Sequence, residues 1–383
     1  MSKQLLRNAR VWVSTVTTGH AKDNTFEVQI KDDLTWAQGN STSTVEISEA
    51  GAAPTRGSKE FNDSLDPVDW SFTTYLRPYL STFGPDWDPD DNVDDEPLVV
   101  TPDAILWQGL ATAADLDIKN GPGVIGNATN MIVDFTDNSH HELLKLNIYV
   151  LADKIWYLIS EGQVGEAAIS NDITAIGETA WSGQGTTMTK LSSAPFLETD
   201  VTSVDCSLTA PYIKNKLTIL KVKDNTSMKV YSVPITGGSV TISNNVTFLT
   251  PNTLSCLDVP IGSFTGTFSV EGEMSAYLDD KVGGTAELMD DIIGARAVTN
   301  DFEISVIMGG EYAAGAPACV IHLSNTQVRI PEINTDDVLG VSVSFKGIPT
   351  DFDAGDEVLI GMSPTYTTAQ IAQFITTGDG DGA

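Results

Sequence analysis

Hydrophobic and polar residues alternate in several short stretches of the chain. In Phe26–Lys31, the residues Phe26, Val28 and Ile30 fall on one side and polar residues on the other. The same period of two recurs in Trp70–Leu76, Tyr231–Thr236 and Phe302–Val306. Successive side chains of a strand point to opposite faces of a sheet, so this period indicates strands with one buried face. We predict a mainly β protein of antiparallel strands with few helices.

Three segments have helical spacing instead. Thr101–Asp103 offers a hydroxyl cap, a proline in the first turn and an acid at the positive end of a helix. Leu106 and Leu110 then share one face of that helix. The second and third helices are expected in Thr285–Ile292 and Thr368–Ile375.

The elements of the first half recur in the same order in the second half: two strands, a long loop, a strand, a helix, strands and a closing strand. The corresponding positions are Leu6–Asn8 with Ile213–Asn215, Phe26 with Tyr231, Phe72 with Val270, Leu76 with Leu278, Leu106 and Leu110 with Leu288 and Ile292, Ile148 with Ile304, and Gln163–Gly185 with Gln327–Pro349. Matches that keep their order favour an internal duplication over chance similarity.

The duplication predicts two tandem β domains with the same order of elements, each containing one helix. We place the first domain at residues 1–187 and the second at residues 209–362. Residues 188–208, which are rich in Ser and Thr, form the linker. Residues 363–383 are expected to hold a short C-terminal helix and a flexible tail. The first repeat carries the longer loops, at Thr82–Val100 and Gly121–His141.

Charge narrows the possible partners. The 383 residues include 21 Lys and Arg against 52 Asp and Glu, a net charge of −31. Such a surface repels phosphate and anionic lipid, which excludes a protein that grips DNA or lies on a membrane surface. It does not exclude a channel that DNA must pass without sticking. Met1–Arg10 has no apolar core of a secretory signal, and Cys206, Cys256 and Cys319 make no disulfide framework or zinc site.

Catalytic motifs are missing from the sequence. Gly121–Gly126 matches a dinucleotide fingerprint only in its glycines, without the strand before it and the helix after it. The acidic run Asp86–Glu96 could hold calcium, but it lacks the central Gly and closing Glu of a calcium loop, so a solvated acidic loop is favoured. We expect no cofactor and no enzymatic activity.

Three classes of function remain at this point. The first is a structural protein that assembles through its sheet edges, since open edges must be paired or covered. The second is a carbohydrate-binding or adhesin-type β-sandwich of a virion or cell surface, which also uses Trp, Thr and Asn. The third is a calcium-dependent or hydrolytic β enzyme, which would need convergent acid and base residues.

One region resembles a known family. Val164–Gly185 is similar to the closing region of bacteriophage tail tube proteins. The residues that carry the resemblance are Val164, Ala167, Ile169, Ile173, Ile176 and Trp181–Gly185. Trp70–Pro78 resembles the middle strand of that family, leading into its helix. The second half keeps the order but has Phe345-Lys-Gly347 where Trp181-Ser-Gly183 stands in the first. The resemblance covers Leu5–Thr187 directly and Tyr212–Met362 through the repeat.

The resemblance implies two tandem tail-tube-like β-sandwich or barrel domains, each with one flanking α-helix. It also implies a virion protein, assembled in the cytoplasm of the bacterial host, whose rings stack into the hollow tail tube that delivers DNA. Rings of this family usually hold six domains, so a duplicated chain implies homotrimeric, pseudo-hexameric rings. The implied partners are the chain itself, the tape-measure, tail-terminator and baseplate or tip proteins, and DNA only transiently in the lumen, with no membrane.

Two surfaces follow as expectations. In the third strand of the second repeat, Phe268, Val270, Gly272, Met274 and Ala276 should point into the core. The opposite face would then line the bore, with Glu271, Glu273, Ser71 and Thr73 as lumen-facing candidates. In the first repeat this exposed face is expected to comprise Ser71, Thr73, Tyr75 and Arg77. The long segments Trp36–Val68 and Gly237–Phe264 are expected to be loops that contact the next ring, with Trp36, Asn40, Asn62 and Asn244 as ring-stacking candidates. We place the acidic run Asp86–Glu96 outside the tube.

Overall fold

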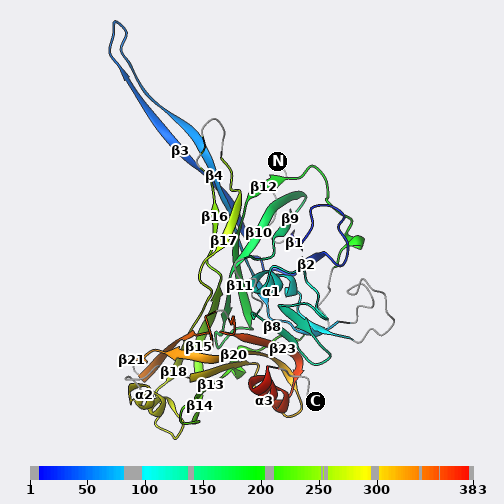
Figure 1. Ribbon diagram of the computed structural model, residues 1–383, viewed down its shortest axis with the longest axis vertical. Helices are drawn as coiled ribbons and strands as arrows, with labels where there is room; N and C mark the ends of the chain where they lie inside the picture. The colour runs from blue at the N-terminus through cyan, green and yellow to red at the C-terminus, as the bar shows by residue number, and fades with distance from the viewer. Residues whose placement is uncertain are drawn as a thin grey trace.

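Antiparallel strands dominate the chain, as the alternating pattern predicts (Figure 1). The computed structural model describes residues 8–81, 97–136, 142–202, 211–251, 253, 258–294, 302–335, 339–352 and 354–378. Within these residues the structure has three α-helices, each in one of the three segments predicted to be helical. The mainly β fold class is therefore confirmed.

The first half, residues 8–202, contains α1 (Ala104–Ala111) and twelve strands. The strands are β1 (Ala9–Ser14), β2 (Thr25–Val28), β3 (Thr35–Glu49), β4 (Thr55–Tyr75), β5 (Tyr79–Leu80), β6 (Val99–Val100), β7 (Val124–Gly126), β8 (Met131–Asp134), β9 (Leu146–Ala152), β10 (Ile155–Ser170), β11 (Glu178–Gly185) and β12 (Thr187–Lys190).

The second half, residues 211–378, contains α2 (Thr285–Gly294), α3 (Thr368–Thr377) and eleven strands. The strands are β13 (Ile219–Asp224), β14 (Val230–Val233), β15 (Ile235–Ser243), β16 (Val246–Leu249), β17 (Gly262–Thr265), β18 (Ser269–Tyr277), β19 (Phe302–Met308), β20 (Ala316–Val328), β21 (Glu332–Thr335), β22 (Leu339–Gly347) and β23 (Leu359–Tyr366).

Strands pair in the same order in both halves. In the first half the pairs run β2–β1–β9–β10–β11–β4–β3. In the second half they run β14–β13–β19–β20–β22–β18–β15. β12 pairs with β10 as β23 pairs with β20. This common pairing supports an internal duplication, while the domain boundaries stay a prediction.

Two pairings join the halves. β10 lies antiparallel to β15, with Ile169 opposite Val240, and β8 lies antiparallel to β23, with Val133 opposite Ile360. The first pairing creates one continuous sheet, which we call the shared sheet, in the order β3–β4–β11–β10–β15–β18–β22–β21. β23 also extends past the expected domain boundary at residue 362.

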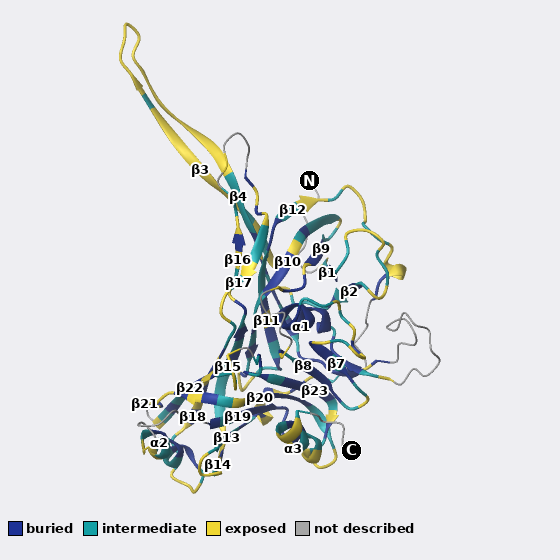
Figure 2. Cartoon of the chain, in the orientation of Figure 1, coloured by how far each residue is buried: buried dark blue, intermediate teal, exposed yellow. Residues whose placement is uncertain are grey.

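Buried residues gather in the body of the chain (Figure 2), and most of them belong to one apolar core cluster. All eight residues of α1 are buried, and Trp107 meets Trp181 edge to face at 4.7 Å between ring centroids. Helix α1 begins at Ala104, so its N-cap position is Asp103 rather than Thr101. Asp103 accepts a hydrogen bond from Thr74 Oγ1 at 2.7 Å, and its burial raises the pKa of its carboxyl group.

Strand pairing also corrects part of the alignment between the repeats. The last regular pair before a bulge is Val164–Gly183 in β10–β11 and Val328–Phe345 in β20–β22. Gly183 therefore corresponds to Phe345, whereas the sequence alignment matches Phe345 to Trp181. The same pairing aligns Phe72 with Met274 rather than with Val270, and keeps Leu76 with Leu278.

Large and small residues exchange places between the two halves. Trp70 lies opposite Gly183 in β4–β11, and Gly272 lies opposite Phe345 in β18–β22. A Cβ on Gly183 would overlap the Trp70 ring, and a Cβ on Gly272 would overlap the Phe345 ring. Each cross-strand pair thus holds one aromatic ring and one glycine. The total side-chain volume of the pair is conserved although the residue at each position differs.

The chain that leaves each half folds back over it. Residues 191–202, which we call the strap, lay the Phe196 ring 5.6 Å from Trp12 and 5.5 Å from Tyr149 and Trp156. In the second half α3 buries Ile371 and Phe374 in the same way. The expected linker is therefore partly strand, in β12, and partly a packed strap. Residues 379–383 of the expected flexible tail lie outside the described residues.

We expect Gly272→Ala to lower the free energy of unfolding by about 1–3 kcal/mol, because the new methyl group overpacks against Phe345. Denaturant unfolding measures this change. Gly262→Ala in β17 is the matched control, since its Cβ would meet no heavy atom within 4 Å. Equal stability of the two variants would contradict the tight packing described for β18–β22.

Candidate assembly and bore surfaces

A polar face crosses the shared sheet from one half to the other. One row of opposed residues runs from Thr73 through Ala180, Ala168 and Thr241 to Glu271. Alternate residues of a strand share a face. The lumen-facing candidates therefore lie together on one face of one sheet: Ser71, Thr73, Glu271 and Glu273.

Carboxylates outnumber ammonium groups on this face. Its acidic residues are Asp69, Glu166, Glu178, Glu271, Glu273 and Glu332. Lys346 Nζ lies 3.3 Å from Glu271 Oε1, and Lys31 Nζ lies 2.8 Å from Glu178 Oε2. The hydrogen bond to Glu178 raises the pKa of Lys31. Both ammonium groups are thus engaged by carboxylates, and the face stays polar and acidic.

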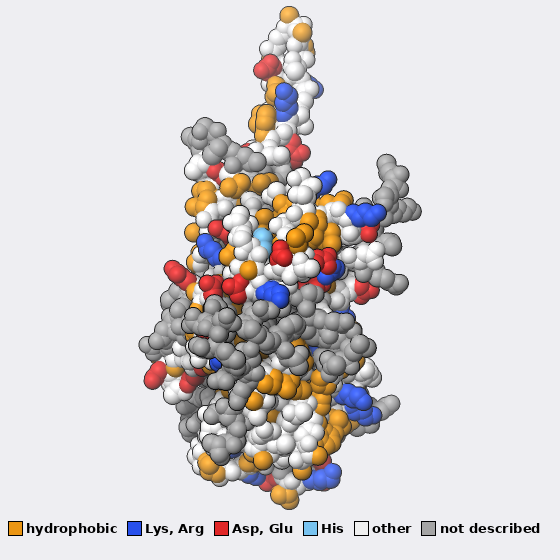
Figure 3. Space-filling view, turned by 90° about the vertical axis from the view of Figure 1, so that its right-hand side faces the viewer, with side chains coloured by type: hydrophobic (Ala, Val, Ile, Leu, Met, Phe, Trp, Pro, Cys, Tyr) orange, Lys and Arg blue, Asp and Glu red, His pale blue; other side chains and the backbone are white. Residues whose placement is uncertain are grey.

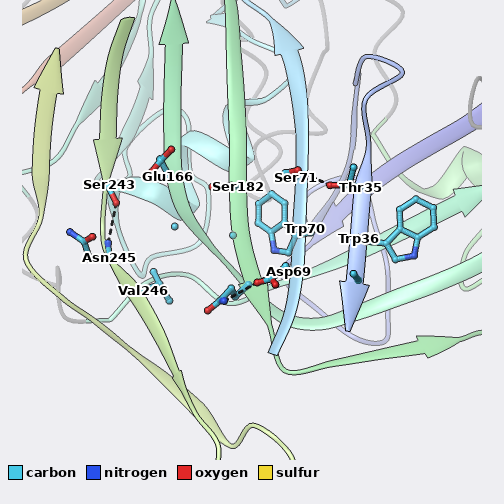
Figure 4. A pocket seen from close by; sticks show the side chains of 14 residues that line it. Thr35, Trp36, Asp69, Trp70, Ser71, Glu166, Ser182, Ser243, Asn245 and Val246 are labelled. Carbon is cyan, nitrogen blue, oxygen red and sulfur yellow. Dashed lines mark hydrogen bonds between the residues drawn. The ribbon is translucent and has the colours of Figure 1, made fainter. Parts of the chain in front are cut away.

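A shallow hollow of about 430 Å³ lies on the first-half side of this face (Figure 4). Five strands meet there side by side, carrying Ser243, Glu166, Ser182, Ser71 and Thr35 in turn. Thr35 Oγ1 and Ser71 Oγ are 2.8 Å apart and share a hydrogen bond. The lining mixes hydroxyl, amide and carboxylate groups with Trp36 and Trp70, and the residues shown hold no paired nucleophile and base.

The predicted alternation in β18 is confirmed. Val270, Gly272, Met274 and Ala276 are buried, and the residues between them are exposed. One related expectation is wrong. Arg77 does not continue the exposed face of β4, because it is only 6% exposed. Its Nη1 donates to Gln29 Oε1 at 3.0 Å, and its guanidinium lies over the Tyr212 ring.

The segment Trp36–Val68 is a long β-hairpin and not the loop that its length indicates. β3 and β4 pair from Thr35–Ser71 out to Glu49–Thr55. Residues 39–65, which we call the arm, project beyond the body of the chain (Figure 1) and are almost wholly exposed (Figure 2). Thr, Val and Ile favour strands, and the small residues at 50–54 suit the turn.

The two faces of the arm differ. Phe61 and Val45 are 51% and 48% exposed and share one face with Ile47. The opposite face carries Thr44 and Glu60, which lie opposite each other, among other polar residues. Figure 3 shows hydrophobic side chains along the projecting arm. Phe61, a large apolar side chain, is therefore half exposed next to other apolar residues of the arm.

The ring-stacking candidates lie in three different settings. Asn40 Nδ2 donates to Asn62 Oδ1 at 2.7 Å across the arm. Trp36 lies at the root of the arm, half-buried, with its ring 5.9 Å from the ring of Tyr157. Asn244 is only 4% exposed and donates to the Leu110 carbonyl at 2.8 Å, so it braces α1 and offers no surface to a neighbour.

Gly237–Phe264 is likewise not one long loop. Most of its described residues belong to β15, β16 and β17. β16 and β17 form a short hairpin, in which Leu249 and Phe264 are exposed. This hairpin region touches the root of the arm, where the Leu65 N–H donates to the Asp258 carbonyl at 2.8 Å.

Both ends of the shared sheet are open. In the described part of the chain β3 pairs only with β4, and β21 only with β22. Ile333 in β21 is 44% exposed, whereas its counterpart Ile169 in β10 is fully buried. Trp36 in β3 is half-buried, whereas its counterpart Val240 in β15 is fully buried. These edges are not visible in the sequence. Ile333 looks like an ordinary core residue until the strand register shows that it lies on an unpaired strand.

The described residues give no support for a metal site or a membrane-spanning helix. No group of three or more His, Cys, Asp or Glu that could hold a metal ion occurs within the ranges described. The acidic run Asp86–Glu96 lies outside those ranges. No helix among the described residues is long and apolar enough to cross a membrane.

A polar sheet face flanked by two open edges, with a projecting arm, is the surface of a protein that assembles with itself. No family model matches the chain. The chain is 46% identical over 384 aligned positions to the tail tube protein pb6 of Escherichia phage T5, covering 99% of this chain and 80% of that protein. It therefore belongs to the tail tube proteins of bacteriophages, structural components of the virion tail. The comparison gives no support to the adhesin-type alternative.

Proposed function

We propose that three copies of this chain close into a ring of six similar domains, and that the rings stack into the tail tube. One observation carries the proposal. The open strands β3 and β21 are the counterparts of β15 and of the inner end of β10, which already pair within the chain. Repeating the internal pairing between chains leaves no edge open, which is what a closed ring requires.

The internal pairing also supplies a register for the contact between chains. Ala168 lies opposite Thr241 in the chain. Their counterparts are Glu332 in β21 and Ala37 in β3, both exposed. We therefore pair Glu332 of one chain with Ala37 of the next, and Ile333 with Trp36. This contact would cover the exposed Ile333 side chain and complete the burial of Trp36.

The polar face of the shared sheet becomes the wall of the bore in this ring. Glu271 and Glu273 would face the lumen with Ser71 and Thr73. Carboxylates and hydroxyls release a phosphate backbone easily, whereas free Lys or Arg would hold it. DNA would contact this wall only in transit, so the protein serves as a conduit with no catalytic role.

The arm carries the contact between rings in this proposal. It projects away from the body, and its apolar face is exposed in the single chain. We assign Asn40 and Asn62 to that contact, and Trp36 to the seam within the ring. The tape-measure, tail-terminator and baseplate or tip proteins would meet the bore and the two ends of the tube.

Cross-linking tests the ring and its register. With Cys206 and Cys256 changed to Ser, Glu332→Cys combined with Ala37→Cys should give reducible species of two and three chains. This pair corresponds to Ala168 and Thr241 within the chain. Because the opposed residues Asn171 and Gly238 are hydrogen-bonded and such pairs alternate along the ladder, Ala168 and Thr241 form a non-hydrogen-bonded pair. The Cβ atoms of directly opposed residues lie about 4.5–5.5 Å apart and are closer in non-hydrogen-bonded pairs, so a disulfide needs only small adjustments.

Two controls accompany this test. Ala168→Cys combined with Thr241→Cys should form its bridge within one chain, and Glu332→Cys combined with Gln38→Cys should form none, because Gln38 points to the other face. Bridges between chains from the Gln38 pair alone would overturn the register. Six chains in a closed ring would overturn the trimer.

Arm variants test ring stacking. Replacing residues 40–62 by a short turn should leave soluble rings that no longer polymerise. A milder variant, Val45→Ser with Phe61→Ser, should shorten or abolish tubes while leaving chain stability unchanged, since both side chains are exposed. The polar-face control is Thr44→Ser with Glu60→Gln. Electron micrographs report tube length, and tubes of normal length from the deletion variant would refute this role.

Charge reversal tests the bore. Glu271→Lys with Glu273→Lys should leave tubes intact and slow DNA ejection, most strongly at low salt, because each new ammonium group adds a phosphate contact. Asp280→Lys with Asp290→Lys, near and on α2, changes the charge equally off the shared sheet. Ejection from reconstituted particles is the readout. Unchanged ejection by the first variant, with tubes verified, would remove this face from the lumen.

A further inference from the structure

The two halves are joined in both layers of the fold. In the shared sheet, which we call the inner layer, β10 pairs with β15. In the outer layer the hairpin Val124–Asp134, formed by β7 and β8, places β8 against β23. Side chains reinforce this second contact. Ser363 Oγ donates to the Thr129 carbonyl at 2.5 Å, and Asn130 Nδ2 donates to the buried Tyr366 hydroxyl at 2.6 Å.

Among the described residues of the second half, no hairpin occupies the position that β7 and β8 hold in the first. In the first half residues 112–145 connect α1 to β9 and contain the hairpin. In the second half only residues 295–301 connect α2 to β19, which is shorter than Val124–Asp134 itself. β12 is the counterpart of β23 and would be the receiving strand. Its Met188 N–H instead donates to Gln38 Oε1 of the same chain.

We propose that the hairpin Val124–Asp134 is a clasp that makes the two seams of the ring unequal. This inference rests on the proposed three-chain ring. Three seams, those within chains, are closed in both layers. The other three, between β21 and β3, are closed in the inner layer alone. A ring therefore opens only between chains, and the intact two-domain chain is the unit that joins and leaves the tube.

A nicked chain compares the two seams directly, since the nick turns the internal seam into an intermolecular one. A protease site inserted between Ser192 and Ser193, both exposed, is cut in the folded protein. The experiment uses a Phe196→Ala background, which removes the aromatic contacts of the strap but keeps the hydrogen bonds of Thr202 to Lys22 and Thr25. Because these remaining contacts are the same in every nicked variant, the comparison with the double variant below isolates the contribution of the clasp. The two fragments should stay together in size-exclusion chromatography at concentrations at least about 100-fold below those at which uncut chains form rings.

The 100-fold difference in concentration is expected because the outer layer adds hydrogen bonds between the fragments. Each added hydrogen bond lowers the dissociation constant of the fragment pair by about two- to tenfold. Ser363→Ala with Tyr366→Phe should weaken the fragment pair by about 4- to 100-fold and leave ring formation by uncut chains unchanged. Fragments that separate at the concentration where rings dissociate would overturn the clasp. So would a double variant with undiminished fragment affinity. Neither outcome depends on the cross-linking test, so failure of the clasp and failure of the ring remain distinguishable.

Discussion

Antiparallel pairing of β10 with β15 is the contact on which the architecture depends. β10 serves both layers: its first part pairs with β9 and β12, whereas its last part pairs with β11 from Gln163 onward and with β15 from Glu166 onward. The contact buries Ile169, Val240 and Ile242 completely, each worth about 1.5–3 kcal/mol of transfer free energy. It also makes the polar face continuous and leaves β3 and β21 as the two ends of one sheet.

The two halves keep the same strand register because equivalent cross-strand pairs conserve their total side-chain volume and not their residue types. Trp70 with Gly183 and Gly272 with Phe345 fill equivalent space with the ring on opposite strands. The same holds on the outer faces, where Phe196 of the strap and Phe374 of α3 cover corresponding layers with unrelated backbones. Aligning residues by type alone places Phe345 with Trp181, two positions from its structural partner.

Local patterns in the sequence account for much of the fold. The alternation in Ser269–Tyr277 and the spacing of Leu288 and Ile292 depend on neighbours within one element, so both were predictable. The arm was not, because its alternation is confined to Val45 and Ile47 and most of residues 40–62 are as polar as a loop. The burial of Asn244 was also not predictable, since its partner Leu110 lies more than a hundred residues away.

The pairing of β8 with β23 sets an order of events during synthesis. β8 ends at Asp134 and β23 begins at Leu359, so nearly the whole second half must emerge from the ribosome before β8 finds its partner. Until then Ile132 and Val133 lie on an uncovered strand edge. A first half without β23 therefore keeps one edge of β8 unpaired, and an unpaired strand edge is a site at which other chains can pair.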